Sequence, residues 1–162
     1  MTMVMDSGQF KTLQKVKSWR FDSAQECVAE KKQYLQKAET LVVETQQARI
    51  EFAAYRVSEK RRLYQEEADQ GGVTLGKIST VNHTLSTLHQ RLMTYQQKEQ
   101  EATQQLAEAQ LELQQARAML LAAQRDMAKY DQVGEHIQRS QHQKAERLQE
   151  QEYEDFKTKP LF

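Results

Sequence analysis

The stretch Asp69-Gln70-Gly71-Gly72-Val73-Thr74 interrupts a long run of helix-forming residues and decides the fold. Glycine is among the residues that most often end regular structure, and Gly71-Gly72 is the only glycine pair in the chain. Thr74 can cap a following helix by accepting a hydrogen bond from a backbone N–H of its first turn. Val73 and Ile78 have the spacing of a hydrophobic staple around that cap. The stretch therefore predicts a turn between two helices.

The rest of the composition favours long helices. Among 162 residues there are 5 Gly and 1 Pro, while Gln, Glu, Ala, Lys, Arg and Leu, all good helix formers, dominate. The β-branched and aromatic residues typical of strands are sparse. We predict one coiled-coil domain over residues 1–162, with helices over about residues 10–69 and 75–157 and a turn at about 70–74.

The second predicted helix carries a heptad repeat, which is typical of a left-handed supercoil. Its first position is Ile78, Leu85, Leu92, Glu99, Leu106, Leu113, Leu120 and Met127. Its fourth position is Val81, Leu88, Tyr95, Ala102, Ala109, Ala116, Ala123 and Tyr130, with Ile137 one heptad further on. Glu99 and Gly134 are exceptions to the apolar pattern.

The first predicted helix has a looser repeat, made of Phe21, Val28, Leu35, Val42, Arg49, Arg56 and Leu63. If the chain folds back at Gly72, residues whose numbers sum to about 144 face each other. Large residues then meet small ones: Val28 meets Ala116, Leu35 meets Ala109, and Val42 meets Ala102. Nearer the turn, Phe52 meets Leu92 and Arg49 lies opposite Tyr95. Both repeats thus predict an all-α fold, a long antiparallel two-helix coiled-coil hairpin.

Two features complete this prediction. An extended dimer, in which each helix pairs with another chain, is the alternative, but a short turn favours the intramolecular hairpin because closing a small loop costs little entropy. We therefore expect an isolated monomer. Residue 137 would face residue 7, so the following C-terminal segment is expected to be a single-helix overhang. It is acidic and carries Leu148, Tyr153 and Phe156, which suggests a docking partner unless this end frays.

Several classes of function are disfavoured by the sequence. The net charge is +0, so no broad basic field exists to hold nucleic acid. The longest apolar run, Ala118 to Ala123, is far shorter than the ~20 residues of a membrane-spanning helix. The N-terminus lacks a secretory signal pattern, and the single Cys27 fits a reducing compartment. We expect a cytoplasmic protein without direct membrane insertion.

Catalysis is also not expected. The sequence contains no Gly-rich phosphate loop, HExxH motif or cysteine pair. His83 and His89 are six residues apart, as are His136 and His142, so neither pair meets on adjacent helical turns as a metal site requires. We predict no enzyme activity, no cofactor and no metal site, and expect a protein that works by binding other proteins.

Two clusters of side chains could bind other proteins, which a purely structural coiled coil would not require. Close to the turn, the segment Tyr55 to Tyr64 is rich in arginine and tyrosine, which are common in binding hot spots. A single arginine such as Arg56 can instead bury only its aliphatic stem and leave its guanidinium group solvated. Near the N-terminus, Lys11, Lys15, Lys17 and Arg20 form a basic stretch with Trp19 and no acidic residue from Lys11 to Arg20. Such a stretch could meet an anionic partner or be an ordinary solvated face.

At these residues the sequence resembles the YscO/FliJ-type stalk proteins (SctO family) of bacterial type III secretion systems. The matching features are Tyr55-Arg56 with Glu59, Arg62-Leu63-Tyr64, the restart Val73-Thr74-Leu75, and Glu146-Arg147 with the acidic residues before Phe156. The likeness is greater to the injectisome branch than to the flagellar one. Size and hairpin shape match along nearly the whole chain.

The resemblance implies a stalk that stimulates the hexameric secretion ATPase and links it to the cytoplasmic ring of the export gate protein at the inner membrane. Some family members also bind secretion chaperones. The implied ATPase-contacting residues are Lys11, Lys15, Trp19, Arg20, Met127, Tyr130 and His136. The implied gate-contacting residues are Tyr55, Arg56, Arg61, Arg62, Tyr64, Leu75 and Lys77. Alternatives are a coiled-coil adaptor or chaperone-escort protein without an ATPase partner, and a tentacle-type holdase chaperone, which would need strands.

Overall fold

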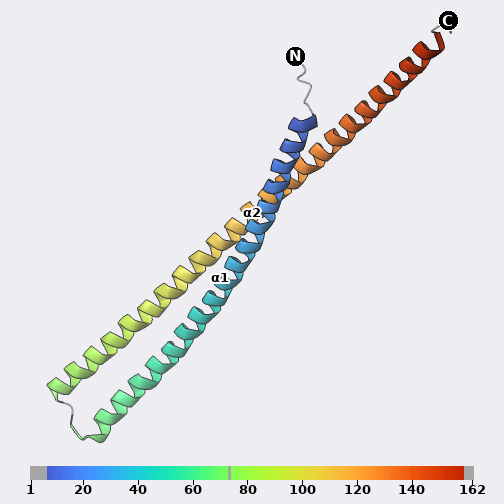
Figure 1. Ribbon diagram of the computed structural model, residues 1–162. Helices are drawn as coiled ribbons and strands as arrows, with labels where there is room; N and C mark the ends of the chain where they lie inside the picture. Colours follow the sequence, from blue (N-terminus) through green and yellow to red (C-terminus); the bar gives the residue numbers. More distant parts are fainter. Residues whose placement is uncertain (1–6, 73, 159–162) are drawn as a thin grey trace. The chain divides into compact units, whose positions relative to one another are not determined.

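The computed structural model describes residues 7–72 and 74–158. They form two helices, α1 (Ser7–Asp69) and α2 (Leu75–Thr158), and the described residues contain no strand (Figure 1). The two helices pack against each other, so the predicted all-α class is confirmed. α1 begins three residues before the expected start at residue 10, and α2 ends one residue beyond the expected end at residue 157.

The turn has the chemistry that its sequence predicts. The backbone N–H of Gln70 still bonds to the Glu66 carbonyl at 3.2 Å, and Gly71 then takes a φ of 71°, the left-handed conformation that ends many helices. Thr74 caps α2, because its Oγ1 accepts a hydrogen bond from the backbone N–H of Lys77 at 3.4 Å. Val73, the other half of the expected staple, lies outside the described residues.

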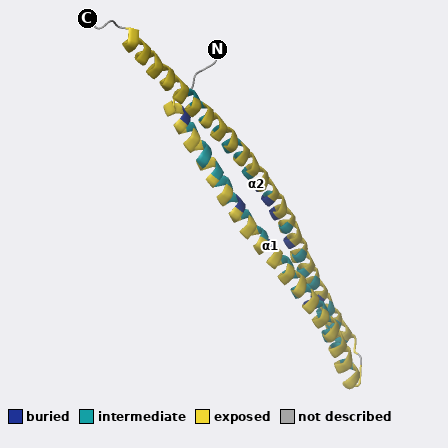
Figure 2. Cartoon of the chain, turned by 90° about the vertical axis from the view of Figure 1, so that its right-hand side faces the viewer, coloured by how far each residue is buried: buried dark blue, intermediate teal, exposed yellow. Residues whose placement is uncertain are grey.

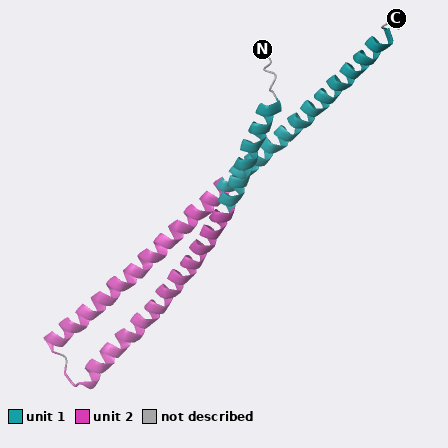
Figure 3. Ribbon diagram, in the orientation of Figure 1, with its two compact units in different colours: residues 1–28, 116–162 teal, residues 29–115 magenta. Residues whose placement is uncertain are grey.

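The chain divides into two compact units, each containing part of both helices (Figure 3). We call residues 29–115, which include the turn, the turn unit. We call residues 1–28 together with 116–162 the terminal unit.

The core of each unit is a narrow seam between α1 and α2. The buried residues are Phe10, Val28, Ala38, Phe52, Leu88, Ala102, Ala109, Leu113 and Ala116. Figure 2 shows them at intervals along both helices, with exposed residues between them. Val28 and Ala116, an expected large–small pair, are both buried, and Ala109 is 0% exposed. Alanine therefore lets the helices approach closely.

Ion pairs between the helices support the antiparallel register. In the turn unit, Lys31 Nζ lies 3.0 Å from Glu112 Oε2. In the terminal unit, Lys17 Nζ lies 3.3 Å from Asp126 Oδ2. In both pairs the residue numbers sum to about 144, as expected for this fold.

Near the turn, two contacts join residues that lie about one helical turn away from the expected facing positions. The ring of Phe52, which is expected to face Leu92, stacks on Tyr95 with centroids 4.8 Å apart. Arg49 pairs with Glu99 rather than facing Tyr95 alone. Long side chains reach along the helix axis to a neighbouring layer, so the arithmetic of facing Cα positions does not fix their partners.

The C-terminal end of α2 has no neighbour in α1. All residues over 141–158 are exposed, and Figure 2 shows this end of the helix as exposed throughout. The expected single-helix overhang is therefore present.

Candidate protein-interaction surfaces

The N-terminal basic stretch presents one face of α1 to solvent. Lys11, Lys15 and Trp19 are spaced by four residues, so they lie above one another on the helix, and all three are exposed. Trp19 is 68% exposed, which is unusual for so large an apolar side chain. Arg20 is also exposed. We call these four residues the terminal surface.

Two of the expected ATPase-contacting residues lie in the seam. Tyr130 packs beside Phe10, with ring centroids 6.5 Å apart, and the Lys17 ammonium lies 5.3 Å from the centre of its ring. Met127 is half-buried. Tyr130 therefore helps to hold α1 on α2 in this unit, whereas His136, the third α2 residue of the set, is exposed.

A shallow groove of about 420 Å³ adjoins the terminal surface, within the terminal unit. Trp19 and Cys27 of α1 and Met119 of α2 contribute to its lining. Met119 is as exposed as Trp19 and was missed from the sequence, because one methionine in an alanine-rich helix gives no periodic signal. Lys17 and Asp126, already paired, lie at the same groove.

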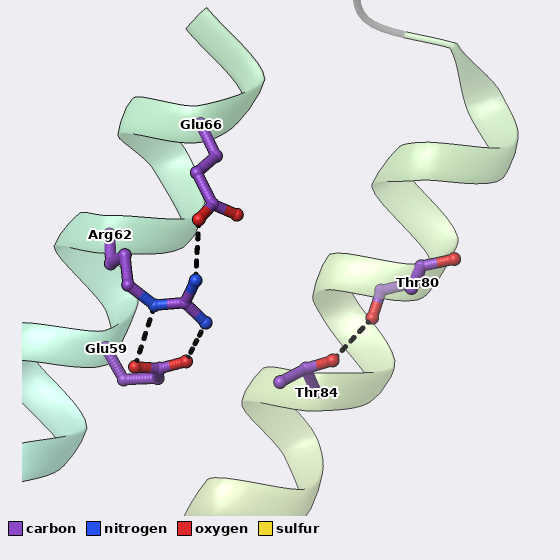
Figure 4. Close-up of polar contacts among 5 residues, drawn as sticks. All are labelled: Glu59, Arg62, Glu66, Thr80 and Thr84. Carbon is purple, nitrogen blue, oxygen red and sulfur yellow. Dashed lines mark hydrogen bonds and ion pairs between the residues drawn. The ribbon is translucent and has the colours of Figure 1, made fainter. Parts of the chain in front are cut away.

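Near the turn, Arg62 is held by two carboxylates of its own helix (Figure 4). Its Nε donates to Glu59 Oε2 at 3.1 Å, its second terminal nitrogen bonds the other Glu59 oxygen, and its first donates to Glu66 Oε1 at 2.6 Å. The hydrogen bond from Arg62 lowers the pKa of Glu59, and Glu59 in turn raises the pKa of Arg62. Arg62 therefore crosslinks the last turns of α1.

The other expected gate-contacting residues differ in how far they are available. Arg61, Tyr55, Tyr64 and Leu75 are exposed, Leu75 to 87%. Arg56 is half-buried. Lys77 is also half-buried, and its Nζ donates to Gln70 Oε1 across the turn at 3.4 Å. We call the seven residues together the tip surface: Tyr55, Arg56, Arg61, Arg62, Tyr64, Leu75 and Lys77.

The comparison with protein families now bears on this geometry. The family model described as type III secretion protein YscO matches residues 10–159, which is nearly the whole chain. The chain belongs to the YscO family. The predicted family resemblance is therefore confirmed, and this YscO-family protein is a component of a bacterial type III secretion apparatus.

A solved structure agrees with that assignment. The crystal structure of type III secretion protein YscO from Vibrio parahaemolyticus is similar with a TM-score of 0.86 and 20% sequence identity, covering 92% of this chain and 93% of that chain. At this identity the likeness shows a shared fold. No curated protein sequence matches the chain.

One polar contact of this YscO-family chain was not foreseen. Arg49 Nε forms an ion pair with Glu99, and the two side chains are only 32% and 25% exposed. Both residues occupy apolar positions of their heptads, where each had seemed an isolated exception. The predicted register gives no signal for the pair, because it places Tyr95 rather than Glu99 opposite Arg49.

Two further features concern the part of the chain that the structure describes, namely metal-ligating groups and membrane-spanning helices. Over residues 7–72 and 74–158, no group of three His, Cys, Asp or Glu side chains is placed to hold a metal ion. No helix among the described residues is both long and apolar enough to cross a membrane.

Proposed function

We propose that the protein is the stalk component that couples the hexameric secretion ATPase to the export gate of its secretion apparatus. The terminal surface would contact the ATPase, with Met127, Tyr130 and His136 of α2 beside it. The tip surface would contact the cytoplasmic ring of the export gate protein. The chain would act as a single domain and a monomer, at the cytoplasmic face of the inner membrane, and would also meet secretion chaperones.

The observation that carries this proposal is the chemical difference between the two exposed surfaces. The terminal surface is a basic stripe ending in an exposed tryptophan, whereas the tip surface combines tyrosines with arginines in the unit that contains the turn. Aromatic and arginine side chains dominate protein-binding hot spots. Two unlike surfaces on one chain support two different partners, which is what coupling requires.

The family assignment supports the general role. YscO-family proteins belong to the secretion apparatus and are not known as enzymes, so ATP hydrolysis would belong wholly to the partner. A pair of packed helices can transmit force because it resists bending more than one helix does. The seam of alanine layers, with Ala109 at 0% exposure, supports such a close-packed element.

The second candidate is a coiled-coil adaptor or chaperone-escort protein without an ATPase partner. It is favoured by the acidic overhang of α2, where Leu148, Tyr153 and Phe156 are exposed. In this reading the overhang, rather than the terminal surface, would be the principal binding site.

Affinity purification of the tagged chain from cells assembling the secretion apparatus tests the proposal. We expect the hexameric ATPase and the export gate protein to co-purify. Reversing the charges of Lys11, Lys15 and Arg20 should lose the ATPase alone, and changing Arg61, Tyr64 and Leu75 should lose the gate protein alone. Recovery of chaperones with neither of these partners would support the adaptor.

A further inference from the structure

A second heptad repeat runs along α1, away from its seam with α2. We call it the outer stripe: Val43, Ile50, Val57 and Tyr64. These four side chains are between 47% and 64% exposed. Each directly follows a residue of the seam repeat, Val42 to Leu63, so each is turned about 100° around the helix from the contact with α2. The stripe extends over three heptads, or roughly 30 Å of helix at 1.5 Å per residue.

The residues beside the stripe would let another helix approach. On its two sides lie Gln46, Gln47, Ala53 and Ala54, which are all uncharged, and the two alanines are short enough to leave shallow holes between Ile50 and Val57. The stripe is also only one large residue wide, which is narrower than the apolar face of a helix that lies in a membrane surface. Its seven-residue period is that of a left-handed supercoil, and the stripe fills one of the two seam positions in each heptad.

Charge at one end of the stripe indicates the chemistry of the occupant. Lys60 and Arg61 are exposed and lie on either side of the stripe between Val57 and Tyr64. Among the described residues neither forms an ion pair, whereas the neighbouring Arg62 is already held by Glu59 and Glu66. Two cationic side chains without an ion-pair partner, beside an apolar stripe, favour a binding partner that places carboxylates next to Lys60 and Arg61.

We propose that the outer stripe docks an amphipathic helix of another protein, one with an apolar seam of about three heptads and acidic residues beside its end at Lys60 and Arg61. A second copy of this chain fits less well. Antiparallel pairing of two stripes would place Lys60 and Arg61 against Gln47 and Gln46 of the other copy, so the two cations would meet no carboxylate. The proposal goes beyond the stalk function. Arg61 and Tyr64 also belong to the tip surface, whereas Val43, Ile50 and Val57, which the stripe variant changes, do not.

A synthetic helical peptide of about 24 residues tests the stripe directly. The peptide has leucines at alternating spacings of three and four, glutamines and alanines elsewhere, and glutamates flanking its last leucines. We expect it to bind the full chain, and the triple variant Val43→Gln, Ile50→Gln, Val57→Gln to weaken binding at least about tenfold, because three apolar contacts are lost. These side chains are exposed, so circular dichroism should show an unchanged fold.

The matched control removes three equally exposed apolar side chains of α2 that form no heptad repeat: Met93→Gln, Leu111→Gln and Leu121→Gln. It should change peptide affinity less than about twofold. A peptide with lysines in place of the glutamates should bind weakly to the parent and better to the variant Lys60→Glu, Arg61→Glu. Absence of peptide binding, or equal losses in the stripe and control variants, would overturn the proposal. A parent dimer in sedimentation that the stripe variant converts to monomer would also overturn it, in favour of a second copy.

Discussion

Arg49 of α1 and Glu99 of α2 form an ion pair inside the seam of the turn unit, at heptad positions that are otherwise mostly apolar. Because both side chains are about three-quarters to two-thirds covered, each charge depends on the other for the hydrogen bonds it has lost to water. The stacked rings of Phe52 and Tyr95 lie in the neighbouring layers of the seam. The Arg49–Glu99 pair is thus a polar contact within a mostly apolar seam.

Removing one member of this pair should cost more than removing both. We expect Arg49→Leu and Glu99→Leu each to lower the free energy of unfolding by about 1 kcal/mol, since one partly buried charge remains without its partner. The double variant should be at least as stable as the parent. Urea denaturation of the four proteins measures the coupling. Additive losses in the double variant would mean that the two charges act independently.

Gly134 accommodates the ring of Phe10 in the terminal unit. A Cβ at residue 134 would lie 3.0 Å from both Cε1 and Cζ of Phe10, so the ring would have to move. Alanine is otherwise favoured over glycine in a helix by about 1 kcal/mol. Gly134→Ala should therefore stabilise the Phe10→Ala variant by about that amount and the parent by clearly less. Equal thermal shifts in both backgrounds would show that the ring does not require the glycine.

The alanine layers should tolerate no large side chain. Ala109 is 0% exposed, so Ala109→Phe should overpack the seam and lower the free energy of unfolding by roughly 1–3 kcal/mol. The neighbouring Gln110→Lys is the control, because Gln110 is exposed and lysine is also a good helix former. Chemical denaturation compares the two. Similar midpoints would argue against close approach of the helices at this layer.

Sequence periodicity predicted the helices and the turn closely, since heptads, a capping threonine and a glycine pair are local signals. It did not predict pairs that depend on side-chain reach, such as Arg49 with Glu99. The repeat of the first helix does not reveal Phe10, because Lys17 stands one heptad after it. Gly134, which accommodates the Phe10 ring, is therefore visible in the sequence only as an exception to the apolar pattern. The outer stripe was also missed, because its apolar residues are informative only once α2 is known to cover the adjacent face.

The binding surfaces were also only partly predictable from the sequence, because they too depend on which side chains contact one another. Clusters of arginine and lysine are visible in sequence, but their ion pairs are not. Arg62 was grouped with Arg61, yet it is held by two carboxylates while Arg61 is exposed. Tyr130 was grouped with Trp19, yet it packs between the helices.

The Glu59–Arg62 contact should have a measurable pH dependence. Because the pKa of Glu59 is lowered in the folded protein, its stabilising contribution is present at neutral pH and is lost as pH falls through that lowered value. The protection factors of amides in the last turns of α1, which correct for the slower intrinsic exchange in acid, should fall over this acidic range. An NMR titration should find the pKa of Glu59 below its ordinary value in the parent and close to it in Arg62→Gln. An unchanged titration in Arg62→Gln would exclude this cause.

The most direct measurement of the central claim is the ATP hydrolysis rate of the cognate secretion ATPase with this protein added. We predict that the parent stimulates hydrolysis and that the triple variant Lys11→Glu, Lys15→Glu, Arg20→Glu abolishes this stimulation. Added salt should progressively reduce the stimulation by the parent, because exposed charges are screened over about 8–10 Å.

The control for that measurement carries the same charge change elsewhere: Lys32→Glu, Lys37→Glu, Arg117→Glu, three exposed positions outside both proposed surfaces. It should stimulate the ATPase like the parent, and both variants should be as helical as the parent by circular dichroism. An ATPase whose rate is unchanged by the parent protein, or one equally stimulated by the parent and the terminal-surface variant, would contradict the stalk function.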